Sequence, residues 1–136
     1  MYQRDYILRL IEEFGRFLQI IMGLRGGKQF GEAMDQLRLA GEQLLKIDLT
    51  GVPEGDEALR AFITDRGYDT RQTDLLSDML LLQGELYMEL GDPLSAIVSL
   101  EQAKFLYRWN DERSKEYSID RVKKLETVEW HLLRLK

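Results

Sequence analysis

The chain has 136 residues, the length of one ordinary domain with a core of its own. Hydrophobic residues make up 44% and charged residues 32%, a balance typical of globular rather than disordered proteins. The lack of cysteine excludes a disulfide framework, a thiol nucleophile and thiolate metal sites, and the single histidine, His131, leaves no imidazole pair. We therefore expect a single domain over residues 1–136, with no cofactor or metal, and read His131 as an incidental helix residue.

The formal net charge of −5 is unevenly distributed along the chain. Residues 48–102 carry three basic and twelve acidic side chains, whereas residues 103–136 carry nine basic and six acidic ones. An acidic middle segment repels nucleic acid and favours a basic partner, although a solvated acidic face would have the same composition. The six acids among the C-terminal bases weaken any nucleic-acid-binding face there. We expect no nucleic-acid partner.

The N-terminal residues do not resemble a signal peptide. Two charges, Arg4 and Asp5, precede any apolar run, and no small-residue cleavage site follows. The apolar patch over residues 17–24 is far shorter than the roughly 20 residues that a membrane-spanning helix needs. These features predict a cytoplasmic protein without a membrane span.

Apolar residues recur at intervals of three and four almost throughout the chain, and β-branched residues never alternate as in a strand. This periodicity predicts an all-α protein of about six helices. The expected helices cover residues 7–23, 30–47, 56–65 and 71–90, a fifth from Pro93, and a sixth that closes the chain at residue 135.

Two boundaries have chemical signatures. Asp92 can cap the fifth helix while Pro93 occupies its first turn, where the missing N–H costs nothing. Asn110, followed by Asp111 and Glu112, has the pattern of a second cap, because acidic side chains favour the positive end of a helix dipole. The sequence thus predicts that the sixth helix begins at Asn110.

Residues 77–110 resemble one tetratricopeptide repeat, a 34-residue helical hairpin. The repeat's large, small and aromatic positions match Leu80, Gly84, Tyr87, Ala96, Leu100 and Ala103. In such a hairpin Gly84 and Ala96 would let the two helices approach closely. The pattern departs from the family at Gln83, where leucine is usual, and at Arg108, where a proline usually ends the repeat.

Residues 14–47 resemble a degenerate second copy of the repeat, in which Ile21 replaces the close-contact glycine. The resemblance implies antiparallel hairpins in a right-handed, tetratricopeptide-like helical stack. The opening residues 5–11 also resemble those of a family of small uncharacterised bacterial proteins, which implies a bacterial source and no function.

In tetratricopeptide proteins the first helix of each pair lines a groove for peptides. The matching residues here are Asp78, Leu81, Glu85, Met88 and Glu89. The resemblance implies an acidic groove that binds a basic or apolar segment of a protein or peptide. An alternative is that Leu81 and Met88 fill the core while the acids face water.

No catalytic constellation is recognisable in the sequence, so we expect a non-enzymatic protein–protein interaction module or scaffold. A structural homo-oligomer assembled through the N-terminal helix is an alternative, because Tyr2, Tyr6, Phe14, Phe17 and Met22 exceed what one apolar face needs. A second alternative, an enzyme using carboxylates alone, would require converging acids with raised pKa values.

Overall fold

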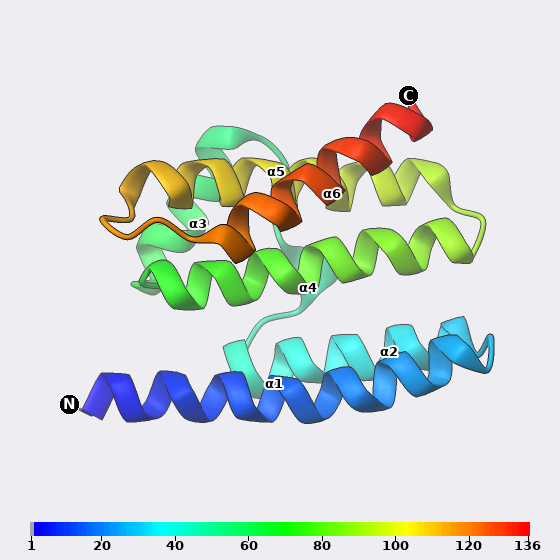
Figure 1. Cartoon of the computed structure of the whole chain (residues 1–136), viewed down its shortest axis with the longest axis horizontal. Helices are drawn as coiled ribbons and strands as arrows, with labels where there is room; N and C mark the ends of the chain where they lie inside the picture. Colours follow the sequence, from blue (N-terminus) through cyan, green and yellow to red (C-terminus); the bar gives the residue numbers. More distant parts are fainter. Residues whose placement is uncertain (1) are drawn as a thin grey trace. The chain divides into compact units, whose positions relative to one another are not determined.

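The computed structural model describes residues 2–136, and it describes side chains from residue 4 onward. This part of the chain forms six α-helices and no β-strand, which confirms the predicted all-α class. The helices are α1 (Tyr2–Gly26), α2 (Phe30–Ala40), α3 (Asp56–Arg66), α4 (Thr70–Glu89), α5 (Pro93–Arg113) and α6 (Ile119–Leu135) (Figure 1). None of the helices in the described range is long and apolar enough to cross a membrane.

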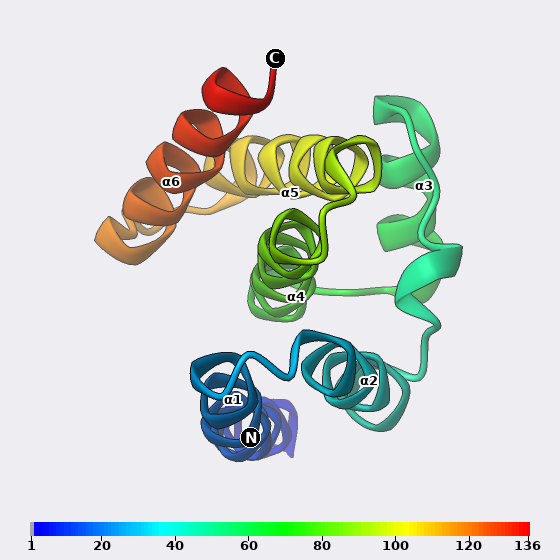
Figure 2. The ribbon, with the colours of Figure 1, turned by 90° about the vertical axis from the view of Figure 1, so that its right-hand side faces the viewer.

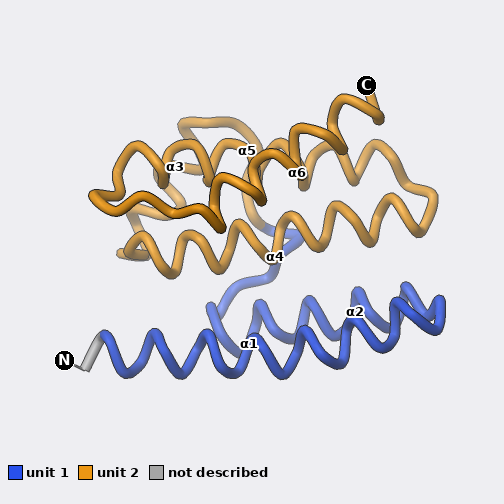
Figure 3. The backbone as a smooth tube through the Cα atoms, viewed as in Figure 1, with its two compact units in different colours: residues 1–51 blue, residues 52–136 orange. Residues whose placement is uncertain are grey.

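The chain divides into two compact units (Figure 3). Residues 1–51 form the first unit, which contains α1 and α2. Residues 52–136 form the second unit, which contains α3 to α6. The expectation of a single domain over residues 1–136 stays a prediction.

The first unit is a hairpin of α1 and α2, in which one apolar stripe of each helix is buried. The turn between them contains Lys28 at a positive φ of 60°. The buried stripe of α1 has the three-and-four spacing expected from the sequence. Its buried members, with those of α2, are Ile7, Leu10, Phe14, Ile21, Ala33, Met34, Leu37 and Ala40.

The second helix is shorter than its apolar period predicts. Regular α-helix ends at Ala40 and is followed by a π-helical turn over Gly41–Leu45, after which Lys46 adopts a left-handed conformation with φ of 59°. A Cβ atom at position 41 would lie 2.9 Å from Leu49 Cγ, so the chain folds back close over Gly41. The wider turn keeps Leu44 buried, which is why the apolar pattern continues past the helix end.

The second unit is built around the antiparallel hairpin of α4 and α5. A capping box starts α4: the Asp69 carboxylate accepts a 2.9 Å hydrogen bond from Gln72 N, and Gln72 Oε1 accepts one of 3.1 Å from Asp69 N. At the start of α5, Asp92 Oδ1 accepts a 3.1 Å hydrogen bond from Ser95 N, and Pro93 is the first helical residue. The predicted Asp92-Pro93 boundary is confirmed.

Close approach of α4 and α5 is possible because Gly84 has no side chain. A Cβ atom at position 84 would lie 2.7 Å from Leu100 Cγ and 3.4 Å from the Ala96 carbonyl oxygen. Ala96, Leu100 and Ala103 are completely buried along the facing side of α5. The close contact that the sequence predicted at Gly84 and Ala96 is confirmed.

The prediction that Asn110 caps the last helix is wrong. Asn110 lies inside α5, completely buried, and its Nδ2 donates 2.7 Å hydrogen bonds to Thr70 O and Asp74 Oδ1. The buried amide is thus satisfied by α4, and α5 continues for three more residues. The N-cap of α6 is Ser118, whose Oγ accepts a 3.1 Å hydrogen bond from Arg121 N.

The α5 helix lies between α3 and α6 in the second unit (Figure 2). It also packs against α4, so α5 contacts all three of the other helices of the unit. The α6 helix also touches α4. The two features of this unit that can hold a functional site are the contact between α4 and α6 and the cleft between α3 and α5.

We expect Gly84→Ala to destabilise the second unit. The added methyl group would overlap Leu100, and overpacking of this kind typically lowers the free energy of unfolding by about 1–3 kcal/mol. Gly23→Ala is the matched control, because Gly23 is a helical glycine with no heavy atom within 4 Å of its added Cβ. Urea unfolding should show the control unchanged or more stable by up to about 1 kcal/mol. Equal effects of the two substitutions would contradict the close contact.

Candidate functional site

The α4 helix presents a row of carboxylates toward α6. Asp74, Asp78 and Glu85 lie on one side of α4, and Arg121, Lys124 and His131 lie on one side of α6. Residues separated by three, four, seven or eleven positions share a helix face, so both rows follow from the helical period. The three pairs join the helices along most of the length of α6.

The pair Asp74–Arg121 is the most enclosed of the three. Arg121 is only 6% exposed, and its Nε and Nη2 donate to the two Asp74 oxygens at 2.9 and 2.8 Å. Arg121 Nη1 also donates to Asp111 Oδ1 at 3.2 Å. Hydrogen bonds and the charges of Asp74 and Asp111 outweigh desolvation and raise the pKa of Arg121, so the guanidinium stays charged.

The Asp78 carboxylate sits between α5 and α6. The Tyr107 hydroxyl donates a 2.5 Å hydrogen bond to Oδ1, and Lys124 Nζ donates a 2.8 Å hydrogen bond to Oδ2. Burial raises the pKa of Asp78 despite the opposing effects of Lys124 and Tyr107. Burial and the nearby charge of Asp78 also raise the pKa of Tyr107, so this hydroxyl remains a hydrogen-bond donor.

The third pair places His131 in the contact between α4 and α6. His131 Nε2 lies 2.8 Å from Glu85 Oε2, and the imidazole ring is mostly buried. The ring is one of three polar contacts that hold α6 against α4, which is a structural role that the sequence did not indicate. No local signal could have shown this role, since Glu85 and His131 are 46 residues apart. The expectation that His131 has no catalytic or metal-binding role stays a prediction.

The structure places the five predicted groove residues in different environments. Asp78 and Glu85 face α6, and Leu81 is buried. Met88 is half-buried and Glu89 is exposed. The α6 helix therefore covers the central part of the predicted groove with basic side chains of this chain. A role of these five residues in binding a partner stays a prediction, and it requires α6 to leave α4.

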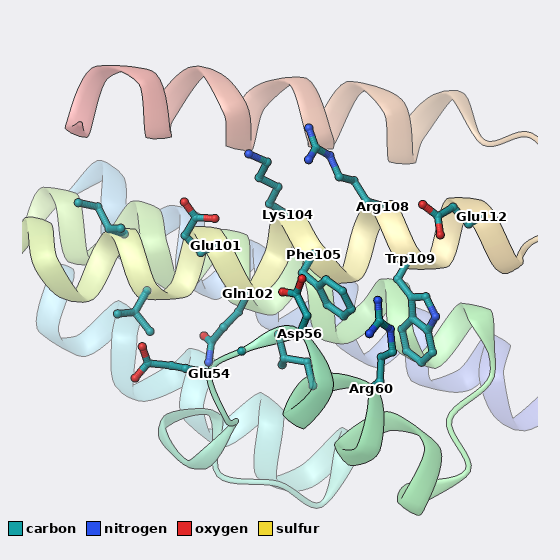
Figure 4. Close-up of a pocket in the computed structure, with 14 residues that line it drawn as sticks. Glu54, Asp56, Arg60, Glu101, Gln102, Lys104, Phe105, Arg108, Trp109 and Glu112 are labelled. Atoms are coloured by element: carbon teal, nitrogen blue, oxygen red, sulfur yellow. The ribbon is translucent and has the colours of Figure 1, made fainter.

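A separate open cleft lies between the segment that starts α3 and one side of α5 (Figure 4). Its volume is about 570 Å³, which is within the usual size range of small ligand sites. Sequence reasoning missed this cleft, because its two walls, residues 54–60 and 97–112, are far apart in the chain. The lining residues are Glu54, Gly55, Asp56, Leu59, Arg60, Ile97, Val98, Glu101, Gln102, Lys104, Phe105, Arg108, Trp109 and Glu112.

Two stacked aromatic rings form part of the α5 wall of the cleft. The centroids of Phe105 and Trp109 are 6.1 Å apart, with 20° between the ring planes, and both residues are half-buried. Arg60 lies 5.0 Å from the Phe105 centroid, and Arg113 lies 3.9 Å from the Trp109 centroid. The guanidinium groups restrict the rings through cation–π contacts. The four-residue spacing of two aromatics on an outer helix face was the available sequence signal.

Gln102 fixes the opposite wall of the cleft. Its Nε2 donates 3.0 Å hydrogen bonds to both Val52 O and Pro53 O, which precede α3. Gln102 is buried, so these bonds satisfy backbone groups that water reaches poorly. The segment leading to Glu54 and Asp56 is therefore held at a defined distance from α5.

The bases on the α5 wall are directed away from the cleft. Figure 4 shows Lys104 and Arg108 pointing toward α6, where Arg108 Nη2 pairs with Glu129 at 2.9 Å. Glu101 forms an ion pair with Lys136. Glu54 and Asp56, on the other wall, are exposed. No cluster of three metal-ligating side chains occurs among the residues that the structure describes.

Known proteins give no further assignment. No protein-family model, no curated protein and no solved structure matches the chain. The resemblance of residues 77–110 to a tetratricopeptide repeat therefore stays a prediction, as does that of residues 5–11 to a bacterial family.

We expect Arg121→Met to detach α6 from α4. Methionine keeps much of the volume of the side chain, but the partly buried Asp74 carboxylate would lose its two charged donors, at a cost of about 3 kcal/mol in the free energy of unfolding. Lys123→Met is the control, because Lys123 is on the exposed side of α6. It should change the free energy of unfolding by less than about 0.5 kcal/mol. Chemical denaturation measures both. An Arg121→Met protein as stable as the control would contradict the assigned role of this pair.

Because of the buried Tyr107 hydroxyl, we expect the free energy of unfolding to decrease at alkaline pH. Because the pKa of Tyr107 is raised on folding, the unfolded chain ionises near the ordinary value of 10.0 while the folded chain keeps the proton. The stabilisation is complete below pH 10 and decreases above it, by up to about 1.4 kcal/mol per pH unit. Tyr107→Phe lacks this dependence, so the difference in unfolding free energy between the two proteins should shrink above pH 10. A constant difference would refute the assignment.

Proposed function

We propose that this chain is a non-enzymatic protein-interaction module whose binding surface is the cleft between α3 and α5. Its ligand is a segment of another protein that carries a basic side chain next to an apolar or aromatic one. The observation that supports this proposal most directly is the stacked pair Phe105 and Trp109 in an open cleft. Aromatic side chains in concave surfaces account for much of the binding energy at protein interfaces.

The aromatic wall is suited to binding because it is already ordered. Phe105 and Trp109 are fixed on a helix, stacked on each other and restrained by Arg60 and Arg113. A ligand that packs on these rings therefore loses its own freedom without having to order the protein. Gln102 holds the opposite wall in place by hydrogen bonds, which adds to this preorganisation.

The preference for a basic segment follows from the charges around the cleft. Glu54 and Asp56 are exposed on one wall, and Glu112 is exposed at the other end. Lys104 and Arg108 of α5 point toward α6, whereas Arg60 and Arg113 are stacked on the two aromatic rings. A lysine or arginine of the partner could approach the carboxylates while an adjacent apolar side chain covers the rings.

The α4 surface is the alternative site. Its acidic row binds the basic side of α6 in this structure, so a partner there would have to replace Arg121, Lys124 and His131 with its own bases. The cleft is favoured because it is open without any rearrangement. The raised pKa of Asp78 gives little support to a carboxylate enzyme, since burial beneath α6 causes it and Tyr107 and Lys124 occupy both oxygens.

The proposal is tested by selecting peptides from a random phage-displayed library on the wild-type chain, with counter-selection on Trp109→Ala. Enriched peptides should combine lysine or arginine with a neighbouring apolar residue. Synthetic copies of these peptides should bind the wild-type chain in a calorimetric titration and lose at least about tenfold in affinity with Trp109→Ala, as expected for a hot-spot residue.

Trp130→Ala is the matched control, because Trp130 is an exposed tryptophan on α6 outside the cleft. Asp56→Lys should weaken the same peptides, whereas Asp65→Lys, also exposed on α3, should not. Circular dichroism verifies that each variant is folded. Failure to enrich any peptide, or equal loss of binding with Trp109→Ala and Trp130→Ala, would overturn the cleft as the binding surface.

A further inference from the structure

The residues expected to join two copies through α1 lie in different environments. Phe14 is buried and Phe17 is half-buried, so these two rings offer little surface to a partner. Tyr6 and Met22 are exposed, and the side chain of Tyr2 lies outside the described residues. Assembly of two copies through the N-terminal helix stays a prediction.

The side chain of Arg60 spans the cleft between α3 and α5. Arg60 belongs to α3, and its guanidinium carbon lies 5.0 Å from the ring centroid of Phe105 on α5. Figure 4 shows the side chain rising from α3 toward the rings of Phe105 and Trp109. Arg60 is exposed, and its guanidinium has no hydrogen bond or ion pair with residues 4–136, whose side chains the structure describes. The contact with Phe105 is therefore what holds it across the cleft.

The second cation of the aromatic wall is fixed more firmly. The Arg113 guanidinium carbon lies 3.9 Å from the Trp109 centroid, and Arg113 Nη2 donates 3.1 Å hydrogen bonds to Thr73 Oγ1 and Asn110 Oδ1. Arg60 has no such hydrogen bonds, and a cation–π contact is weak at an exposed site. Arg60 can therefore leave its ring easily, whereas Arg113 would lose two hydrogen bonds as well.

A guanidinium is the cation best suited to the face of Phe105. It is planar and more weakly hydrated than an ammonium group, so arginine stacks on aromatic rings better than lysine does. The exposed side chains of Glu54 and Asp56 line the same cleft, and their carboxylates attract a second cation. An arginine of a partner would thus meet a ring that already accepts a guanidinium, beside two carboxylates.

We propose that an arginine of the partner replaces Arg60 on the ring of Phe105. This proposal rests on the proposed function, because it identifies the basic side chain of the segment that the cleft binds. Two guanidinium groups repel each other and cannot occupy one ring face, so Arg60 turns outward into solvent when the partner binds. The partner's guanidinium then takes over the contact, and the ring keeps its position. Arg60 is thus an internal competitor that lowers the affinity for cations and favours arginine over lysine.

Arg60 also opposes a basic partner through its charge, and this effect differs from competition for the ring. Repulsion between charges acts equally on an arginine and on a lysine of the partner. Competition for the ring acts mainly on arginine, because lysine gains less from stacking. Peptides that differ only in this one residue therefore separate the two effects.

The experiment uses the peptides selected on the wild-type chain, which should carry arginine more often than lysine. In a calorimetric titration, Arg60→Ala should bind an arginine peptide about two- to fivefold more tightly than the wild type does, which is the size of one exposed cation–π contact. The same peptide with lysine in place of arginine should gain less than about twofold. Arg66→Ala is the matched control, because Arg66 is also exposed on α3, stacks on Phe62 at 3.7 Å and lies outside the cleft. It should leave both affinities unchanged.

Proton NMR follows the position of Arg60 directly. In the free chain the ring current of Phe105 should shift the Arg60 Hδ resonances upfield, and saturation with the arginine peptide should abolish this shift. Selected peptides that carry only lysine, an unchanged Arg60 shift in the complex, or equal gains for the arginine and lysine peptides would overturn the replacement and leave the cleft as the binding surface. A chain that binds no peptide would overturn the proposed function, and the replacement with it.

Discussion

The structure of residues 52–136 depends on the missing side chain of Gly84. The Leu100 side chain occupies the space that a Cβ at position 84 would fill, so the α4 and α5 backbones lie unusually close along completely buried alanines. This contact fixes the rotation of α5 about its own axis. Once that rotation is set, Phe105 and Trp109 face α3, while Arg108 faces α6. The cleft and the position of α6 therefore both depend on the close packing of α4 against α5.

Charge determines where α6 binds, because its apolar contribution is small. Only Val128 and Leu132 among its apolar residues are buried, whereas Arg121, Lys124 and His131 each meet a carboxylate of α4. Ion pairs stabilise little when fully exposed, but those of α6 are partly enclosed and connected by Tyr107, Asn110 and Asp111. Such a network specifies one position of α6 along α4, since sliding by one turn would leave Asp74 and Asp78 without their charged donors Arg121 and Lys124.

The sequence predicted what depends on local periodicity and backbone chemistry. The helices, the Asp92-Pro93 boundary and the close approach at Gly84 and Ala96 all follow from neighbours in the chain or from small residues at fixed spacing. Asn110 was misassigned because an asparagine that caps a helix and one that is buried between helices look alike in sequence. The anchors of α6, the cleft and the role of Gln102 depend on contacts between residues 46 to 50 positions apart, which a single sequence does not encode locally.

The acidic side chains of residues 48–102 are not all available to a partner, because some of them pair with bases of α6. Asp74 and Asp78 are already matched by Arg121 and Lys124 of α6, so they add little to the field that a basic partner would meet. The exposed acids that remain in this segment are Asp48, Glu54, Asp56, Glu57, Asp65, Asp69, Glu89 and Asp92, and four of them, Glu54, Asp56, Glu57 and Asp65, lie in or just before α3. The α3 helix also carries the exposed bases Arg60 and Arg66, so the acids that a basic partner can meet beside the aromatic rings are chiefly Glu54 and Asp56, which line the cleft. The overall charge of −5 therefore does not describe what a partner meets at any one place, because the pairing between α4 and α6 cancels charges of both signs and leaves the other acids spread over separate parts of the surface.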